Sequence, residues 1–193
     1  FYCNAVGSQT EIVFDGGSFV FDKDANLCGA LPMFESAMQI FECNEDGTIN
    51  APIIEAAARV PSKELNPAVL MPELNIDQVY KALVLGVKDY FNKMGFKRAI
   101  LGSSGGIDSA VTLAIACDAL GKENVHAILM PSSYSTDHSV NDAVQLSKNL
   151  NNQYDIIPIK DVYETFLTTL QPIFKDLPFS LAEENIQSRS RGN

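Results

Sequence analysis

Residues 102–109 read Gly102-Ser103-Ser104-Gly105-Gly106-Ile107-Asp108-Ser109, and they are the most informative run of the chain. It follows a short apolar run that ends at Leu101 and precedes a run of helical composition that ends at Leu120. A buried strand, a turn with little side-chain bulk and a helix N-terminus are therefore predicted in succession. Backbone N–H groups converge at such a point and the helix dipole adds partial positive charge, so the stretch predicts an anion-binding site.

The side chains of this loop favour a phosphate ligand. Ser104 and Ser109 can add hydroxyl donors, and Asp108 indicates a divalent cation, because a bare phosphate would be repelled by its carboxylate. The loop is neither the P-loop, which needs a Lys after the glycines, nor the G-x-G-x-x-G dinucleotide fingerprint. The alternative is a glycine-rich turn without a ligand. The serines that flank the glycines and the Asp-Ser that follows them favour the anion site.

Strand-like and helix-like segments alternate on both sides of the loop. Helices are expected over residues 75–94, 108–120, 139–150 and 162–170, and strands over 97–101, 125–130 and 154–159. The third helix is expected to open at Ser139, with Asp142 three residues on. This alternation predicts an α/β fold, a doubly wound parallel sheet with right-handed crossovers and helices on both faces. Ligands of such sheets bind beyond the carboxyl ends of the strands, where the glycine loop falls.

The sequence ahead of this domain has a different character. Residues 1–43 contain short apolar runs separated by turn signals, as in a hairpin, with the Asp15-Gly16-Gly17-Ser18 loop joining two runs. Residues 44–72 carry Pro52, Pro61, Pro67 and Pro72, which prevent long regular elements, so this stretch is expected to be a connector with one short helix within 53–59. The α/β domain is then expected over residues 73–193.

Composition excludes several classes of function. A net charge of −10 and a pI near 4.6 argue against a nucleic-acid surface, although a nucleotide can still bind backbone N–H groups and a metal ion. No apolar run approaches the roughly 18–20 residues that span a bilayer. Four cysteines without a C-x-x-C pair predict free, mostly buried thiols in a reducing cytoplasm. The first residues lack a signal peptide, and both ends read as the middle of an element, so a segment of a longer protein is expected.

Three runs carry a resemblance to a known family. The Ser-Gly-Gly-Ile-Asp-Ser run at 104–109 resembles the pyrophosphate loop of the N-type ATP pyrophosphatases. Residues 129–139, which contain Tyr134-Ser135-Thr136-Asp137-His138-Ser139, are similar to the adenosine-side loop of glutamine-dependent NAD synthetases. Residues 181–193 are similar to the helix with which that family meets its dinucleotide substrate.

The resemblance implies a set of site residues. Asp108 would be a Mg²⁺ ligand, and Asn185 and Arg189, which share a helical face at i and i+4, would contact deamido-NAD. The alternative for the arginines is a solvated face paired with Glu183 or Glu184. ATP is implied as co-substrate, and its expected contacts are Gly102, Ser103, Ser104, Gly105, Gly106, Ile107, Asp108, Ser109, Met130 and Ser132.

One tyrosine and two histidines near these runs are given no catalytic role. Tyr134 either covers the adenine or closes its loop. His138 is expected to be a capping or surface residue. His126, inside an apolar strand, is expected to be structural.

The N-terminal runs at 4–7, 11–14 and 15–19 look like the closing strands of a nitrilase-type amidase domain, an α/β/β/α fold that this family carries ahead of the synthetase. Its Glu-Lys-Cys catalytic set is expected before Phe1, and Cys3 is rejected as a nucleophile because its surroundings do not match. A second metal ligand and the remaining ATP contacts are expected after Asn193.

The reaction implied is an ATP-dependent amidation. ATP adenylates the nicotinate carboxylate of deamido-NAD and releases pyrophosphate, and ammonia from glutamine then gives NAD and AMP. The resemblance also implies a homo-oligomeric, cytoplasmic enzyme without nucleic-acid or membrane partners. Two alternatives remain open: another amidotransferase with this loop, such as GMP synthetase, and a non-catalytic nucleotide-binding module, which has little need of Asp108.

Overall fold

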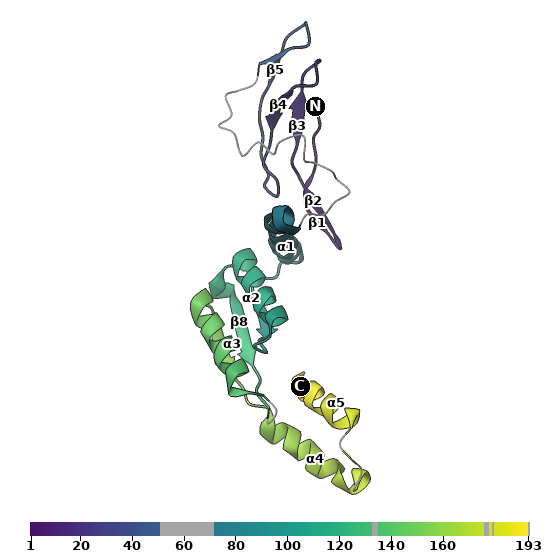
Figure 1. Ribbon diagram of the computed structural model, residues 1–193, viewed down its shortest axis with the longest axis vertical. Helices are drawn as coiled ribbons and strands as arrows, with labels where there is room; N and C mark the ends of the chain where they lie inside the picture. The colour runs from purple at the N-terminus through teal and green to yellow at the C-terminus, as the bar shows by residue number, and fades with distance from the viewer. Residues whose placement is uncertain (51–71, 133–134, 176–177, 179, 193) are drawn as a thin grey trace. The chain divides into compact units, whose positions relative to one another are not determined.

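The computed structural model describes residues 1–50, 72–132, 135–175, 178 and 180–192 (Figure 1). The chain divides into two compact units, Phe1–Gly95 and Phe96–Asn193. Most of the expected connector, including the helix within 53–59, lies outside the described residues. Among the described residues, no helix combines the length and apolar character that crossing a bilayer requires.

The N-terminal unit contains three antiparallel strand pairs. They are β1 (Val6–Gln9) with β2 (Ile12–Asp15), β3 (Phe19–Phe21) with β4 (Leu27–Ala30), and β5 (Glu42–Cys43) with β6 (Ile49–Asn50). The expected hairpin across Gly16 and Gly17 is wrong. These glycines, at φ 73° and 62°, connect one hairpin to the next, because β2 pairs with the preceding strand β1, and β3 pairs with the following strand β4.

The unit closes with helix α1 (Pro72–Met94), which packs against β1 and β2. It begins three residues before the expected Asn75. Proline is well suited to a first helical position, because its missing N–H would have no intrahelical partner there. Gly95, at φ 73°, follows the last residue, as expected. By its contacts α1 belongs with the hairpins, and the domain boundaries drawn from the sequence stay a prediction.

The C-terminal unit is built on a three-stranded parallel sheet in the order β7 (Ala99–Gly102), β8 (Val125–Leu129), β9 (Gln153–Ile156). Helix α2 (Ile107–Leu120) and a short 3₁₀ turn (Lys122–Asn124) join β7 to β8, and α3 (Asp137–Leu150) joins β8 to β9. Helices α4 (Lys160–Phe174) and α5 (Leu181–Ser190) follow. The parallel α/β fold expected from the alternation is confirmed.

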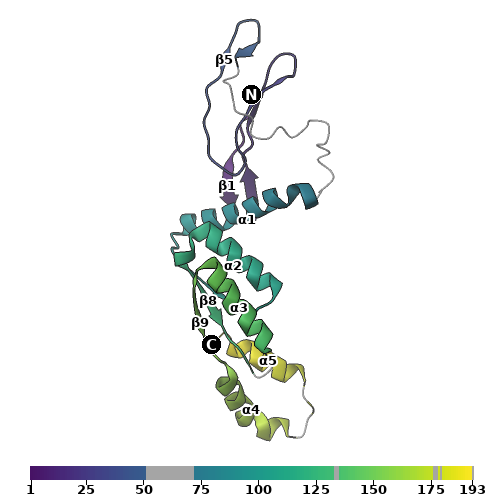
Figure 2. The same cartoon turned by 60° about the vertical axis from the view of Figure 1, so that its left-hand side comes forward.

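The core of this unit lies between the sheet and the helices α2 and α3, which share one face of it (Figure 2). Its buried members are Leu113, Cys117, Val125, Ala127, Leu129 and Ala143. On the opposite face the side chain of Ile100 is 71% exposed. The second helical layer of a doubly wound sheet stays a prediction.

Three local expectations differ from the structure. Thr136, not Ser139, caps α3, because its Oγ1 accepts from the Ser139 N–H at 3.3 Å. Helix α4 runs past residue 170 and contains Pro172, and β9 is shorter than the run 154–159.

The cysteines are free, as expected, but they are not mostly buried. Cys117 alone of the four is buried; Cys3 and Cys43 are exposed, and Cys28 is intermediate. Burial raises the pKa of the Cys117 thiol, which keeps it protonated and unreactive.

Candidate nucleotide site

The loop 102–106 lies where the sequence places it, between the carboxyl end of β7 and the N-terminus of α2. The Ser103 N–H donates to the Ile128 carbonyl at 2.9 Å and fixes the start of the loop to β8. Gly106 is the N-cap of α2 and, having no side chain, makes no cap bond to the first turn; in the described part of the chain no side chain is bonded to the amides of residues 107–109. These amides and the helix dipole are therefore open to an anion.

The loop rests against the first turn of α3. Gly105 has φ 83°, and a β-carbon there would lie 2.1 Å from the backbone oxygen of Ser139. A side chain at this position is excluded twice, by the backbone conformation and by the backbone of α3. The N-terminal turns of α2 and α3 consequently meet at the same edge of the sheet.

The two loop serines bond to each other. Ser104 Oγ lies 3.1 Å from Ser109 Oγ, and it also accepts from the Gly106 N–H at 3.2 Å. Ser109 Oγ accepts from the Ser104 N–H at 3.2 Å and donates to the Gly106 carbonyl at 2.9 Å. The hydroxyls expected to bind phosphate thus hold the shape of the loop in the ligand-free chain, and rotation about χ1 would be needed to turn them to a ligand.

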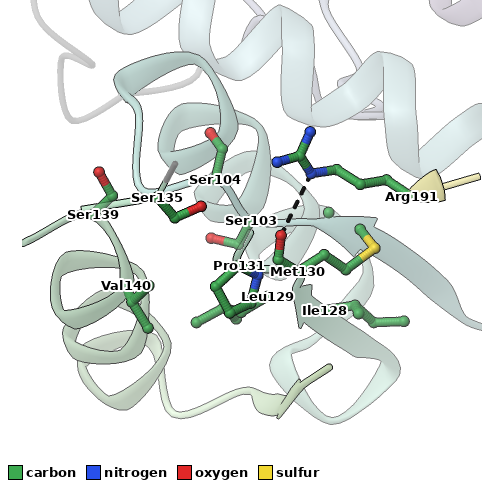
Figure 3. Close-up of a pocket in the computed structure, with 11 residues that line it drawn as sticks. Ser103, Ser104, Ile128, Leu129, Met130, Pro131, Ser135, Ser139, Val140 and Arg191 are labelled. Atoms are coloured by element: carbon green, nitrogen blue, oxygen red, sulfur yellow. Dashed lines mark hydrogen bonds between the residues drawn. The ribbon is translucent and has the colours of Figure 1, made fainter. Parts of the chain in front are cut away.

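A cavity of about 320 Å³ opens beside the loop, between the ends of β7 and β8, the first turns of α3 and the end of α5 (Figure 3). Among its described lining residues Arg191 alone is charged. Ser103 is 5% exposed, and its Oγ has no hydrogen-bond partner among the described residues. The lining consists of Gly102, Ser103, Ser104, Ile128, Leu129, Met130, Pro131, Ser135, Ser139, Val140 and Arg191.

Helix α5 reaches this cavity through residues that the sequence did not single out. Gln187 Nε2 donates to Ser132 Oγ at 2.5 Å. Arg191 Nε donates to the Met130 carbonyl at 3.4 Å, the bond drawn in Figure 3. Asn185 and Arg189 are exposed and are not among the lining residues. Their expected contact with deamido-NAD stays a prediction. Of the described residues at the end of α5, Arg191 lines the cavity.

A capping box fixes the start of α5. Glu183 Oε2 accepts from both the N–H and the hydroxyl of Ser180 at 2.8 Å, which lowers the pKa of the Glu183 carboxyl. This carboxylate therefore serves the helix cap, which leaves it poorly placed for the arginine pairing considered from the sequence.

The carboxylate of Asp108 stands exposed in the first turn of α2. In the described part of the chain no three His, Cys, Asp or Glu side chains gather into a metal site. One carboxylate nevertheless fits Mg²⁺ in nucleotide sites, where the ion takes one or two carboxylates and completes its shell with phosphate oxygens and water.

The remaining residues considered from the sequence divide into three groups. His126 Nε2 lies 2.8 Å from Asp155 Oδ2 on the neighbouring strand, in keeping with the structural role expected of it. His138 is exposed in the first turn of α3. Tyr134 lies outside the described residues.

Comparison with known proteins identifies the family. The NAD synthase family model matches residues 79–193, which include the loop, the cavity and α5. The chain belongs to the NAD synthase family. The N-terminal hairpins precede the matched region.

Individual relatives agree. The chain is 44% identical over 194 residues to a glutamine-dependent NAD(+) synthetase from Synechocystis sp., covering 100% of this chain and 32% of the relative. It is similar to the structure of glutamine-dependent NAD+ synthetase from Acinetobacter baumannii in complex with ADP, with a TM-score of 0.84 and 35% identity over 99% of this chain and 34% of that one. The chain therefore spans about a third of the length of these relatives.

A third similarity covers less of the chain. An NMN synthetase from Francisella tularensis matches 60% of this chain and 46% of its own, with a TM-score of 0.53 and 29% identity.

Proposed function

We propose that this chain is part of a glutamine-dependent NAD synthetase, and that its C-terminal unit binds ATP to adenylate deamido-NAD. The observation that carries the proposal is the open N-terminus of α2, held against α3 by Gly105 at the carboxyl edge of a parallel sheet. The relatives that match the whole chain support it, since they are glutamine-dependent NAD(+) synthetases.

Each part of the site takes one role in this proposal. The loop 102–109 holds the β- and γ-phosphates, chiefly through the amides at the start of α2, with Ser104 and Ser109 as additional donors. The cavity next to the loop, which Met130 lines, receives the adenosine, and Ser132 contacts the ATP from the chain that follows β8. Asn185 and Arg189 contact deamido-NAD.

Asp108 holds Mg²⁺ against the phosphates in this proposal, and the bound ion neutralises negative charge on them. The exposed position of the carboxylate at the start of α2 leaves room for both ion and nucleotide. Without the ion, the carboxylate would weaken the anion site that the helix provides.

The chemistry asked of these residues is positioning and charge neutralisation. A carboxylate is a poor acyl donor, so the α-phosphorus of ATP accepts the nicotinate oxygen, and the bond to pyrophosphate breaks. The loop amides stabilise the departing pyrophosphate. Ammonia then attacks the acyl carbon and AMP leaves, and fixed placement of the two reactants supplies much of the rate enhancement.

In this proposal the N-terminal unit belongs with the domain that releases ammonia from glutamine. Residues 1–43 are the closing strands of a nitrilase-like amidase, with its Glu-Lys-Cys set ahead of Phe1. The whole protein is a cytoplasmic homo-oligomer that delivers ammonia from glutamine to the adenylate.

The test is ATP–pyrophosphate exchange by the full-length protein. Exchange is measured without acceptor and with deamido-NAD, with nicotinate mononucleotide, or with xanthosine monophosphate, the acceptor of a GMP synthetase. The second acceptor is included because the synthetase unit is also similar to an NMN synthetase. Exchange that depends on deamido-NAD supports the proposal. Exchange with another acceptor reassigns the substrate, and nucleotide binding without any exchange leaves a non-catalytic module.

A further inference from the structure

The β1–β2 hairpin lies against α1 (Figure 2). One carboxylate of α1 fastens the two together. Asp89 Oδ2 accepts from the Ser8 N–H at 2.6 Å and from the Ser8 hydroxyl at 3.4 Å. Lys93 Nζ lies 2.8 Å from the same oxygen and also donates to the Ser8 carbonyl. Both backbone polar groups of Ser8 are thus bonded to charged side chains of α1, and bonds of this kind are stronger than neutral ones.

The contact is closely fitted. Ser8 is 6% exposed, and its hydroxyl also lies 3.4 Å from the Gly86 carbonyl. Gly7 has φ 134°, and a β-carbon there would lie 3.0 Å from Asp89 Oδ2. Glycine therefore lets the strand approach the carboxylate as closely as the hydrogen bonds require.

Helix α1 also contains a second ion pair with the same spacing, which serves as a comparison. Asp77 and Lys81 form an i, i+4 pair at 2.7 Å with exposed side chains, and the structure gives Asp77 no hydrogen bond to the hairpin. Such a surface pair adds little stability. Asp89 and Lys93 have the same spacing, but their partners lie 81 and 85 residues away in the sequence.

We call the hydrogen-bonded contact of Ser8 with Asp89 and Lys93 the clamp. It joins two parts of the chain that differ in their relation to the synthase family. The family match begins at residue 79, so α1 is sequence of the synthase family, whereas the hairpin precedes it. Only residues 95–98 separate α1 from β7, which ends in the phosphate loop. The clamp therefore ties the region ahead of the synthase family to the helix that leads into the nucleotide site.

We propose that Asp89 is a positioning residue that couples the glutamine-dependent region to the synthetase, so that ammonia released from glutamine reaches the adenylate. The inference rests on the proposed function. Ammonia supplied from solution does not need this alignment, so loss of the clamp acts on glutamine-supported synthesis alone.

The experiment compares full-length wild type with Asp89→Asn, Gly7→Ala and Asp77→Asn. Asp89→Asn removes the charge that holds Lys93 and halves the acceptor capacity at Ser8. Gly7→Ala pushes the strand away and leaves every charge in place. Asp77→Asn is the matched control, since it breaks the other i, i+4 pair of α1. NAD formation is measured with saturating glutamine and, separately, with saturating ammonium chloride, together with glutamate release.

Asp89→Asn and Gly7→Ala are expected to lower the ratio of the glutamine-supported to the ammonia-supported rate by about fivefold or more, the lower range of coupling between sites. Glutamate release continues, so hydrolysis is no longer matched by NAD. Asp77→Asn keeps the wild-type ratio.

Other outcomes separate this inference from the proposed function. An unchanged ratio in both variants, or an equal fall in the two rates, overturns the coupling role and leaves Asp89 as a stabilising contact. If Asp89→Asn fails to fold, Gly7→Ala alone decides between these results. Wild type that makes no NAD from either nitrogen source overturns the proposed function, and the coupling role with it.

Discussion

Gly105 and Ser139 approach so closely that a β-carbon on the first would lie 2.1 Å from the backbone oxygen of the second. The glycine loop and the start of α3 are therefore built as one surface. Because the obstacle is backbone, it cannot rotate away as a side chain would.

Gly105→Ala is expected to displace the loop and reduce ATP–pyrophosphate exchange below detection. Gly95→Ala is the control: Gly95 also has positive φ, at 73°, but a β-carbon there would have no neighbour within 4 Å. The control carries only backbone strain of about 1–2 kcal/mol and should keep its exchange activity. Equal activity of the two variants would contradict the role given to the Gly105–Ser139 contact.

Ser103→Ala should separate stability from binding. Its buried hydroxyl has no partner among the described residues, and an unsatisfied buried polar group costs about 1–3 kcal/mol. The variant is therefore expected to melt at the same or a higher temperature, yet to gain less thermal stability from ATP. Ser147→Ala removes another unpartnered buried hydroxyl, outside the cavity lining, and should leave the ATP effect unchanged. A lower melting temperature for Ser103→Ala alone would point to a purely structural serine.

Arg191→Met and Arg189→Met should affect different substrates. Arg191 lines the cavity next to the loop, whereas Arg189 is exposed on α5. A hydrogen bond to a charged group contributes about 1.5–3 kcal/mol, so the loss is expected to raise the affected KM about tenfold or more. Arg191→Met should raise the KM for ATP, and Arg189→Met that for deamido-NAD. The opposite pattern would exchange the two roles.

Asp108→Asn should lower exchange about 100-fold or more, as expected when a group that stabilises transition-state charge is lost. Binding of ATP in the absence of Mg²⁺ should become tighter, because the amide no longer repels the phosphates. Titration of ATP with and without Mg²⁺ by calorimetry checks both parts. A variant that keeps wild-type exchange would remove Asp108 from the site.

The clamp of Asp89 should also be visible in the pH dependence of stability. Hydrogen bonds from Lys93 and from Ser8 hold the pKa of this carboxyl below its ordinary value of 3.8. At acidic pH the folded chain therefore binds fewer protons than the unfolded one. The contribution of the Asp89 carboxylate to the free energy of unfolding is complete above pH 3.8 and is lost as the pH falls through the pKa of the folded state. The difference in melting temperature between wild type and Asp89→Asn should shrink below about pH 4. A constant difference would show that charge is not involved.

The nucleotide loop could be predicted because its signals are local. A short apolar strand, glycines and a helix start follow one another within residues 99–109, and each limits the conformation of the next. The strands β7, β8 and β9 were expected within a few residues of their bounds for the same reason.

What escaped prediction depends on partners distant in sequence. Nothing around Asp89 distinguishes it from Asp77, since the difference lies in Ser8, 81 residues away. Near the end of α5, nothing in the sequence marks Arg191 as a lining residue of the cavity, because each residue turns the helix face by about 100° and the fold decides which side meets the end of β8. At α3 both Thr136 and Ser139 are suitable caps by residue type, and only the path of the chain after β8 selects Thr136.

The two helices that meet at the loop begin differently. Thr136 completes α3 from within the chain, whereas the first turn of α2 has no side-chain cap. A bound phosphate would supply that cap from outside, so nucleotide would act as a missing structural part as well as a reactant. Amide hydrogens of residues 107–109 should then exchange freely with solvent in the empty protein and slow sharply once nucleotide arrives.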